Sequence, residues 1–137
     1  MKELIGTGTA LITPFTEDYR IDFDALSRII EQQIAGGTNY FVMLGTTGES
    51  VTLSKEEKAA VVTHIKTVNA GRLPLVLGVG GNYTVEVVNQ LKNLDTNGLT
   101  AILSVSPYYN KPNQQGILHH YKEVADNSPL PIILYNV

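Results

Sequence analysis

Cysteine and long apolar runs are both absent from this chain of 137 residues. The lack of cysteine excludes disulfides and a thiolate nucleophile. No apolar stretch approaches the ~20 residues that a membrane-spanning helix needs. The first seven residues, MKELIGT, have neither the apolar segment nor the small-residue cleavage site of a secretory signal. These absences make the cytoplasm the expected location and indicate no membrane partner.

Charge is also sparse. Charged residues make up 17% of the chain, with 10 Lys and Arg against 13 Asp and Glu, and the net charge is −3. No basic run stands out, so the sequence lacks the electrostatic footprint of a protein that binds nucleic acid. His119 and His120 are neighbours on a presumed helix and face different ways, and no metal-ligand spacing appears. We expect no bound metal.

Nucleotide-binding and nucleophile motifs are missing too. Gly78-Val79-Gly80 resembles the start of a dinucleotide fingerprint, but Tyr83 stands where its third glycine would be. Neither a P-loop nor a Gly-x-Ser-x-Gly elbow is present. The sequence therefore predicts no cofactor.

The chain does contain short apolar runs that alternate with helical patterns. Hydrophobic residues make up 43% of it, which suits a globular protein with a packed core. The apolar runs are continuous, as expected for strands that are buried on both faces of a sheet. They occupy residues 9–12, 40–44, 75–77, 101–103 and 132–134.

Helical patterns fill the intervals between these runs. The first starts near Asp22 and closes at Gly36-Gly37. The second opens with a capping box, in which Ser54 and Glu57 each cap the backbone of the other. The third is expected to be capped by Thr84, and the fourth covers about residues 114–125. The apolar positions of the third pattern, before its expected end at Asn97-Gly98, are Val88, Leu91 and Leu94.

This order predicts an α/β fold with a parallel sheet and right-handed crossovers. Periodicity leaves a doubly wound sheet and a (β/α)8 barrel open, because both read as alternating strands and helices. The length suits one domain over residues 1–137 but falls far short of the roughly 250 residues of a complete barrel. In either architecture, ligands bind at the carboxyl ends of the strands.

Hydroxyls and glycines gather at those strand ends. Residues 45–50, GTTGES, can turn with exposed N–H groups beside two hydroxyls and so can hold a small carboxylate. The alternative is a plain turn in which Thr46 and Thr47 bond locally, and the segment taken alone slightly favours that interpretation.

Tyrosines form the second group of candidates, with Tyr108 and Tyr109 in a loop between two prolines and Tyr135 at the end of the fifth strand. A phenol can relay a proton when it is bonded to another hydroxyl, although an ordinary pKa of about 10 makes it a poor lone base. The alternative is an amphipathic aromatic at a surface or interface. Lys111 sits in a polar loop and is expected to be solvated, whereas an imine-forming lysine needs a desolvated pocket.

Five motifs in order resemble the dihydrodipicolinate synthase / N-acetylneuraminate lyase superfamily. The Thr-Thr pair and the Tyr-Tyr-Asn loop favour its synthase branch over the neuraminate lyases. The motifs are TALITPF at residues 9–15, GTTGES at 45–50, GVGGN at 78–82, PYYNKP at 107–112 and YNV at 135–137.

The resemblance implies the first five strands and four helices of a TIM (β/α)8 barrel. It implies a Schiff-base lyase that condenses pyruvate with aspartate semialdehyde on the path to diaminopimelate and lysine, as a homo-oligomer built as a dimer of dimers. By position, Thr46, Tyr109 and Tyr135 match the family's catalytic hydroxyl relay, with Tyr109 supplied by a neighbouring subunit. Thr47 matches the residue that holds the pyruvate carboxylate.

In many members of this superfamily, lysine binds at the dimer interface as a feedback inhibitor. The matching positions here include Ser50, Asn82, Glu86 and Tyr108. In the family pattern, a Pro-Gly-Arg segment and the imine-forming lysine would follow Val137. Two other functions stay open: a sister aldolase such as N-acetylneuraminate lyase or a 2-keto-3-deoxy sugar acid aldolase, and a non-enzymatic half-barrel.

The chain as written is expected to be catalytically inactive and to associate. Five strands cannot close a barrel, and closure to eight is what removes sheet edges. The purified chain of 137 residues should therefore form a dimer or a larger assembly, or have a partly disordered C-terminal end, and light scattering measures its state of association. A monodisperse monomer with a cooperative melt would show instead that the half-barrel is self-sufficient.

Overall fold

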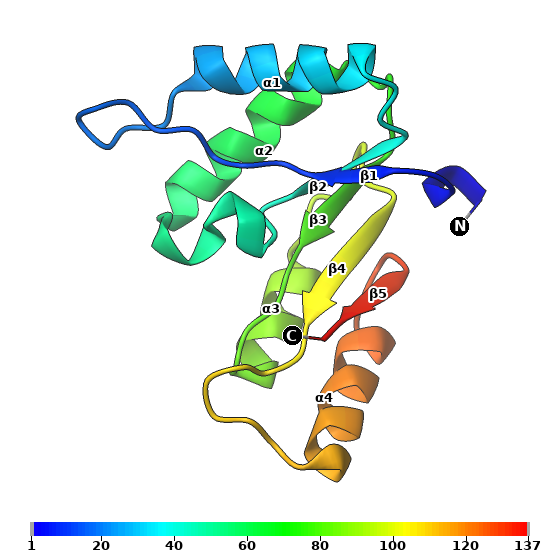
Figure 1. The fold of residues 1–137 in the computed structure, drawn as a ribbon. Helices are drawn as coiled ribbons and strands as arrows, with labels where there is room; N and C mark the ends of the chain where they lie inside the picture. The colour runs from blue at the N-terminus through cyan, green and yellow to red at the C-terminus, as the bar shows by residue number, and fades with distance from the viewer. Residues whose placement is uncertain (1, 137) are drawn as a thin grey trace.

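The computed structural model describes residues 2–136 and shows the α/β architecture that the alternation predicts (Figure 1). Within this range the strands are β1 (Gly8–Ala10), β2 (Tyr40–Met43), β3 (Leu75–Gly78), β4 (Ala101–Val105) and β5 (Ile132–Tyr135). The α-helices are α1 (Phe23–Ala35), α2 (Lys55–Asn69), α3 (Thr84–Lys92) and α4 (Gln114–Asp126). Short 3-10 turns are η1 (Lys2–Leu4), η2 (Thr46–Gly48) and η3 (Ser50–Thr52).

The order of the strands decides between the two architectures. The described strands form one sheet in the order β1-β2-β3-β4-β5, and each adjacent pair is parallel. In a doubly wound sheet the order of the strands reverses at a switch point, so β1 would lie in the interior of the sheet. In a (β/α)8 barrel, by contrast, each strand pairs with the next one along the chain, as the strands do here.

The core lies between the sheet and its helices. Fully buried side chains come from both layers, including Leu26 and Ile30 of α1, Phe41 of β2, Ile65 of α2 and Val124 of α4. Helix α1 packs against α2, and α3 packs against α4. Among the described helices, none is both long enough and apolar enough to cross a membrane.

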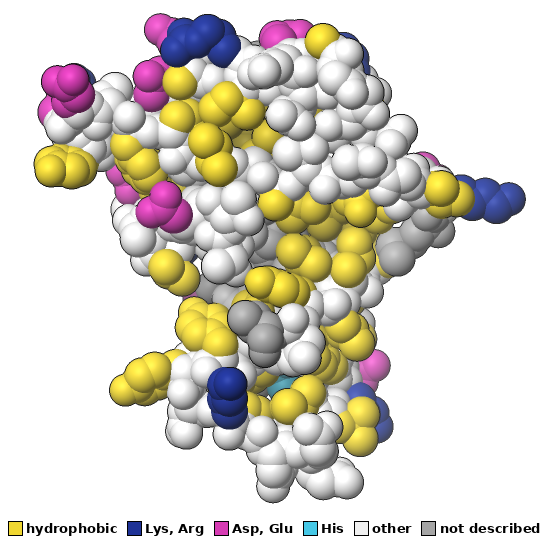
Figure 2. All heavy atoms as spheres, viewed as in Figure 1, with side chains coloured by type: hydrophobic (Ala, Val, Ile, Leu, Met, Phe, Trp, Pro, Cys, Tyr) yellow, Lys and Arg dark blue, Asp and Glu magenta, His cyan; other side chains and the backbone are white. Residues whose placement is uncertain are grey.

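The expectation that the strands are buried on both faces fails for most of them. Only β3 has three consecutive buried residues, whereas β2 alternates between buried and half-buried positions. Strand β5 stands at an edge of the described sheet, and Leu134 is 64% exposed there. Figure 2 shows hydrophobic side chains gathered over the region of the sheet on one face of the molecule. That surface remains uncovered because the described helices pack on only part of the sheet.

The helix ends follow the sequence signals at three of the four helices. Asp22 accepts from the backbone N–H of Ala25 at 2.8 Å at the start of α1. The capping box is present at α2, where Ser54 and Glu57 exchange hydrogen bonds of 2.7 and 3.1 Å. Helix α4 begins one residue after Asn113, which caps it, and ends one residue later than expected, at Asp126.

Helix α3 differs from its prediction at both ends. Its N-cap is Tyr83, and Thr84 is its first helical residue, whose hydroxyl lies 2.9 Å from Nδ1 of His120 on α4. The helix ends at Lys92 rather than near Asn97. Its buried residues are Val87 and Leu91, while Val88 is only half-buried. The Thr84 hydroxyl, which the sequence pattern assigns to capping, is instead bonded to His120 of α4.

His120 fixes α4 against α3 from within the core. Its side chain is 2% exposed, and within residues 2–136 its Nε2 has no hydrogen-bond partner. Burial therefore lowers the pKa of the imidazole, because protonation would place a charge where water cannot reach it.

This burial predicts a pH-dependent stability. In the unfolded chain the pKa of His120 returns to its ordinary 6.5, so below that pH the unfolded state takes up a proton that the folded state resists. The free energy of unfolding should fall as the pH drops from about 7.5 to about 5.5. Denaturant titrations at stepped pH measure the slope. His120→Asn should remove it and His119→Asn should keep it; equal slopes in the two variants would contradict the assignment.

Candidate active site

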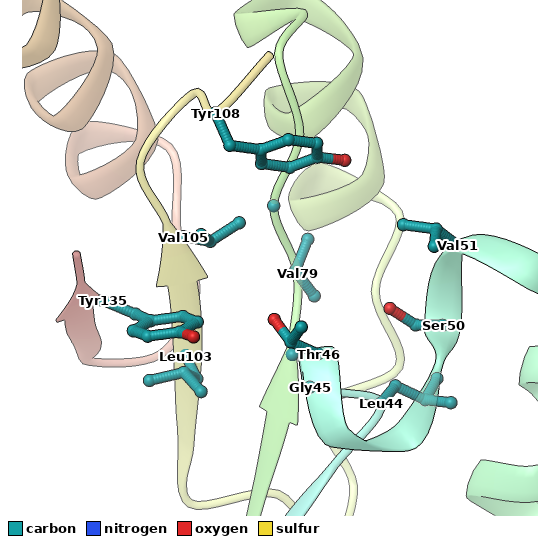
Figure 3. A pocket seen from close by; sticks show the side chains of 12 residues that line it. Leu44, Gly45, Thr46, Ser50, Val51, Val79, Leu103, Val105, Tyr108 and Tyr135 are labelled. Atoms are coloured by element: carbon teal, nitrogen blue, oxygen red, sulfur yellow. The ribbon is translucent and has the colours of Figure 1, made fainter. Parts of the chain in front are cut away.

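A cavity of about 320 Å³ opens where β2, β3, β4 and β5 end (Figure 3). Its walls are mostly apolar, and four hydroxyl-bearing side chains project from them. No charged side chain is among the residues that line it: Leu44, Gly45, Thr46, Ser50, Val51, Gly78, Val79, Gly80, Leu103, Val105, Tyr108 and Tyr135.

The turn after β2 brings Thr46 to this cavity. Leu44 adopts a left-handed backbone conformation at φ 53°, which redirects the chain immediately beyond the strand. The following 3-10 turn is held from beneath by Thr13, whose hydroxyl donates to the carbonyl of Gly48 at 2.7 Å. Gly48 is buried, and a Cβ there would lie 3.1 Å from the carbonyl oxygen of Leu11. Any side chain at that position would therefore be in tight contact with the backbone of Leu11.

The end of β3 approaches the same turn. A Cβ built on Gly78 would lie 2.4 Å from the carbonyl oxygen of Leu44, which is closer than a real Cβ can come. Glycine at this position therefore lets the backbone of β3 press against the turn that presents Thr46. Gly78 and Leu44, which meet at this contact, both line the cavity.

Thr46 and Tyr135 face each other across the cavity. Figure 3 shows the phenol of Tyr135, from the end of β5, directed toward the Thr46 side chain. In the plain-turn interpretation, Thr46 would bond within its own segment. A local bond of that kind is made in the next turn, η3, where the hydroxyl of Thr52 donates to the carbonyl of Glu49 at 2.9 Å.

The whole chain matches one family of enzymes. The model of the dihydrodipicolinate synthetase family covers residues 3–137. The chain belongs to this family. It is 57% identical over its full length to the 4-hydroxy-tetrahydrodipicolinate synthase of Flavobacterium psychrophilum, and 53% identical over 98% of its length to that of Parabacteroides distasonis. It spans less than half of each relative, 47% and 45% respectively.

Solved structures of the family share the fold. A chloride-inhibited dihydrodipicolinate synthase from Acinetobacter baumannii, complexed with pyruvate, matches 96% of this chain with a TM-score of 0.90 and 43% identity. A dihydrodipicolinate synthase from Thermotoga maritima also matches 96%, with a TM-score of 0.89 and 36% identity. The chain covers 45% and 44% of these structures and corresponds to the N-terminal half of their barrels.

The family's hydroxyl positions fall in two places. Thr46 and Tyr135 line the cavity, but Tyr109 does not line it, and its side chain is 90% exposed. Thr46 and Thr47 are both exposed on the same turn, but only Thr46 is part of the cavity wall. Of the YNV motif, Val137 lies outside the described residues. Lys111 is exposed in its loop and stands apart from the cavity.

The positions that match the family's lysine site are only partly together. Ser50 and Tyr108 line the cavity, and Asn82 supports Tyr108 by accepting from its backbone N–H at 2.7 Å. Glu86 lies on the exposed side of α3, where it accepts from Gln90 at 3.2 Å. Among residues 2–136, no group of three His, Asp or Glu side chains could hold a metal ion.

Sequence reasoning overlooked the apolar walls. Leu103 and Val105 of β4 line the cavity, whereas Ile102 and Ser104, which alternate with them along the strand, are buried on the other face. Successive strand residues point to opposite faces, so counting by two from Val105 would have separated wall from core. The continuous apolar run at residues 101–103 concealed that distinction.

Proposed function

We propose that this chain forms the N-terminal half of a 4-hydroxy-tetrahydrodipicolinate synthase, a lyase that condenses pyruvate with aspartate semialdehyde in lysine biosynthesis. The observation that carries the proposal is the pair of hydroxyls, Thr46 and Tyr135, that face each other in an uncharged cavity. Support also comes from the curated relatives, which have this name, and from the related structure complexed with pyruvate.

In this proposal, the reaction starts with a lysine on the sixth strand, in sequence that follows Val137. Its amine forms a bond to the keto carbon of pyruvate, and the carbonyl oxygen takes up a proton. A second proton then lets that oxygen leave as water, which yields the imine. Loss of a proton from the methyl group gives the enamine, whose carbon attacks the aldehyde.

The hydroxyls of this chain would move those protons. Tyr135 would give a proton to the departing oxygen and receive one in return, with Thr46 as its link to a second phenol. A chain of neutral hydroxyls suits this cavity because its apolar walls would penalise a permanently charged acid or base. Thr47 and the backbone N–H groups of its turn would hold the pyruvate carboxylate.

The second phenol is Tyr109 of a neighbouring copy of the chain. Tyr109 does not line its own cavity and is exposed, so an interface between copies is the route by which it would reach Thr46. One structure that shares this fold is described as a monomeric dihydrodipicolinate synthase variant, with a TM-score of 0.91 and 35% identity.

Ser50, Asn82, Glu86 and Tyr108 would contribute to a feedback site for lysine at that interface. The hydrogen bond from Tyr108 to Asn82 joins two of these residues, and Ser50 and Tyr108 also line the cavity that holds Thr46. A ligand that moved Tyr108 would thereby act on the wall of the proposed active site.

Replacement of one phenol tests the assignment. In the complete polypeptide, Tyr135→Phe should lower turnover by ~10²–10⁴-fold, since a positioned proton relay is lost. Tyr108→Phe removes the same group from the same cavity and should have a much smaller effect. Steady-state kinetics with pyruvate and aspartate semialdehyde give both values, and comparable losses would count against Tyr135 as the relay.

Reduction of the imine tests the reaction class. Borohydride added with pyruvate should inactivate the complete polypeptide, because reduction converts the imine into a stable amine. Mass spectrometry should map the added mass to a lysine beyond Val137, and borohydride without pyruvate serves as the control. Modification of Lys111 would refute its assignment as a solvated lysine, and no modification at all would refute the Schiff-base route.

A further inference from the structure

A pair of hydroxyls lies between α4 and the ends of β4 and β5, outside the cavity. The phenol oxygen of Tyr121 is 2.9 Å from the hydroxyl of Ser106. It is also 3.0 Å from the carbonyl oxygen of Ser104 and 3.1 Å from that of Tyr135. The Ser106 hydroxyl itself lies 3.3 Å from the Tyr135 carbonyl. The two hydroxyls thus connect the ends of two strands to a helix.

The protons available determine how this cluster is bonded. The carbonyls of Ser104 and Tyr135 can only accept hydrogen bonds. The Tyr121 phenol has a single proton, which it donates to one of these carbonyls or shares between the two. The Ser106 hydroxyl then donates to the phenol oxygen or to the Tyr135 carbonyl. The backbone N–H of Ser106 adds a bond of 2.9 Å to that same carbonyl. The Tyr135 carbonyl is consequently held by groups from both β4 and α4.

The phenol of Tyr121 acts on the last paired residue of β5. Val105 and Tyr135 are the final paired residues of β4 and β5. One more backbone bond follows them, from the N–H of Ser106 to the Tyr135 carbonyl at 2.9 Å, and the pairing of the two strands ends there. The Tyr121 and Ser106 hydroxyls act at that point, on the backbone of the residue whose side chain faces Thr46.

Helix α4 gives Tyr121 a fixed support. The preceding residue, His120, is buried and bonded to Thr84 of α3, and Val124 is fully buried one turn later. Adjacent residues of a helix point in different directions, so His120 reaches α3 while Tyr121 reaches the strand ends. The phenol is therefore held against the sheet by the packing of the helix.

We propose that Tyr121 is a positioning residue: through the Tyr135 carbonyl, with Ser106, it fixes the Tyr135 phenol at the catalytic cavity. This rests on the proposed role of Tyr135 as the proton relay. Tyr121 does not line the cavity, so it acts on the reaction only through the backbone of Tyr135.

A double-mutant cycle in the complete polypeptide tests the proposal. Tyr121→Phe keeps the ring and removes the hydroxyl, and it should lower kcat by about threefold to tenfold with little change in KM for pyruvate. The same substitution made in a Tyr135→Phe background should have no further effect on kcat, because the phenol that Tyr121 positions is already gone. Tyr19→Phe, at a side chain that is 88% exposed, is the matched control and should leave kcat unchanged.

Two outcomes would overturn the proposal by itself. The first is an unchanged kcat for Tyr121→Phe when Tyr135→Phe is strongly impaired. The second is an equal loss from Tyr121→Phe in both backgrounds, which would indicate a general structural effect. If Tyr135→Phe alone leaves kcat unchanged, the proposed function of Tyr135 fails and this inference fails with it.

Ser106 supplies an independent pair of variants should Tyr121→Phe fold poorly. Ser106→Ala removes the second hydroxyl of the cluster, and Ser106→Thr keeps it. Ser106→Ala should lower kcat and Ser106→Thr should restore it toward the parent value, with both effects absent in the Tyr135→Phe background. A loss that Ser106→Thr does not restore would overturn the role of the hydroxyl cluster.

Discussion

Parallel pairing between consecutive strands is the constraint on which the rest of this structure depends. Because each strand from β1 to β5 pairs with the next, all of them end at one edge of the described sheet. Thr46 and Tyr135 are far apart in sequence and meet only because their strands end together there. Register matters equally, since a slip of one residue would turn Tyr135 to the opposite face.

Close backbone approach then converts that edge into a cavity. Gly78 lets β3 contact the carbonyl of Leu44, and Gly48 lets the turn after β2 pack close to the carbonyl of Leu11, where Thr13 also bonds to it. The contact at Gly78 excludes a side chain and the contact at Gly48 leaves little room for one, so backbone packing positions the turn that carries Thr46. The left-handed conformation of Leu44 is sustained by the same packing.

The cavity combines apolar walls with neutral hydroxyls. Leu103 and Val105 keep the wall apolar, while Tyr135 ends the neighbouring strand on the same face. Neutral hydroxyls can be buried in such surroundings at a smaller desolvation cost than carboxylates or ammonium groups. Proton transfer by a relay of hydroxyls therefore fits the environment, and the proposed support from Tyr121 would keep the relay in place from behind the sheet.

The sequence by itself determined what depends on neighbouring residues. Asp22 and the Ser54–Glu57 capping box set helix starts because their partners lie three residues away. Motifs at the strand ends, taken together, also indicated the family that the comparisons established.

Only the tertiary structure decided what depends on distant contacts. Periodicity left the barrel and the doubly wound sheet open, and the strand order, which arises from pairing between separate segments, confirmed the barrel that the family resemblance implied. The start of α3 was misassigned because His120, 36 positions further along the chain, takes the hydroxyl of Thr84. Tyr121 belongs to no motif, and nothing local marks its contact with the Tyr135 carbonyl. Such contacts leave no periodic signal in a sequence, because folding rather than spacing brings their partners together.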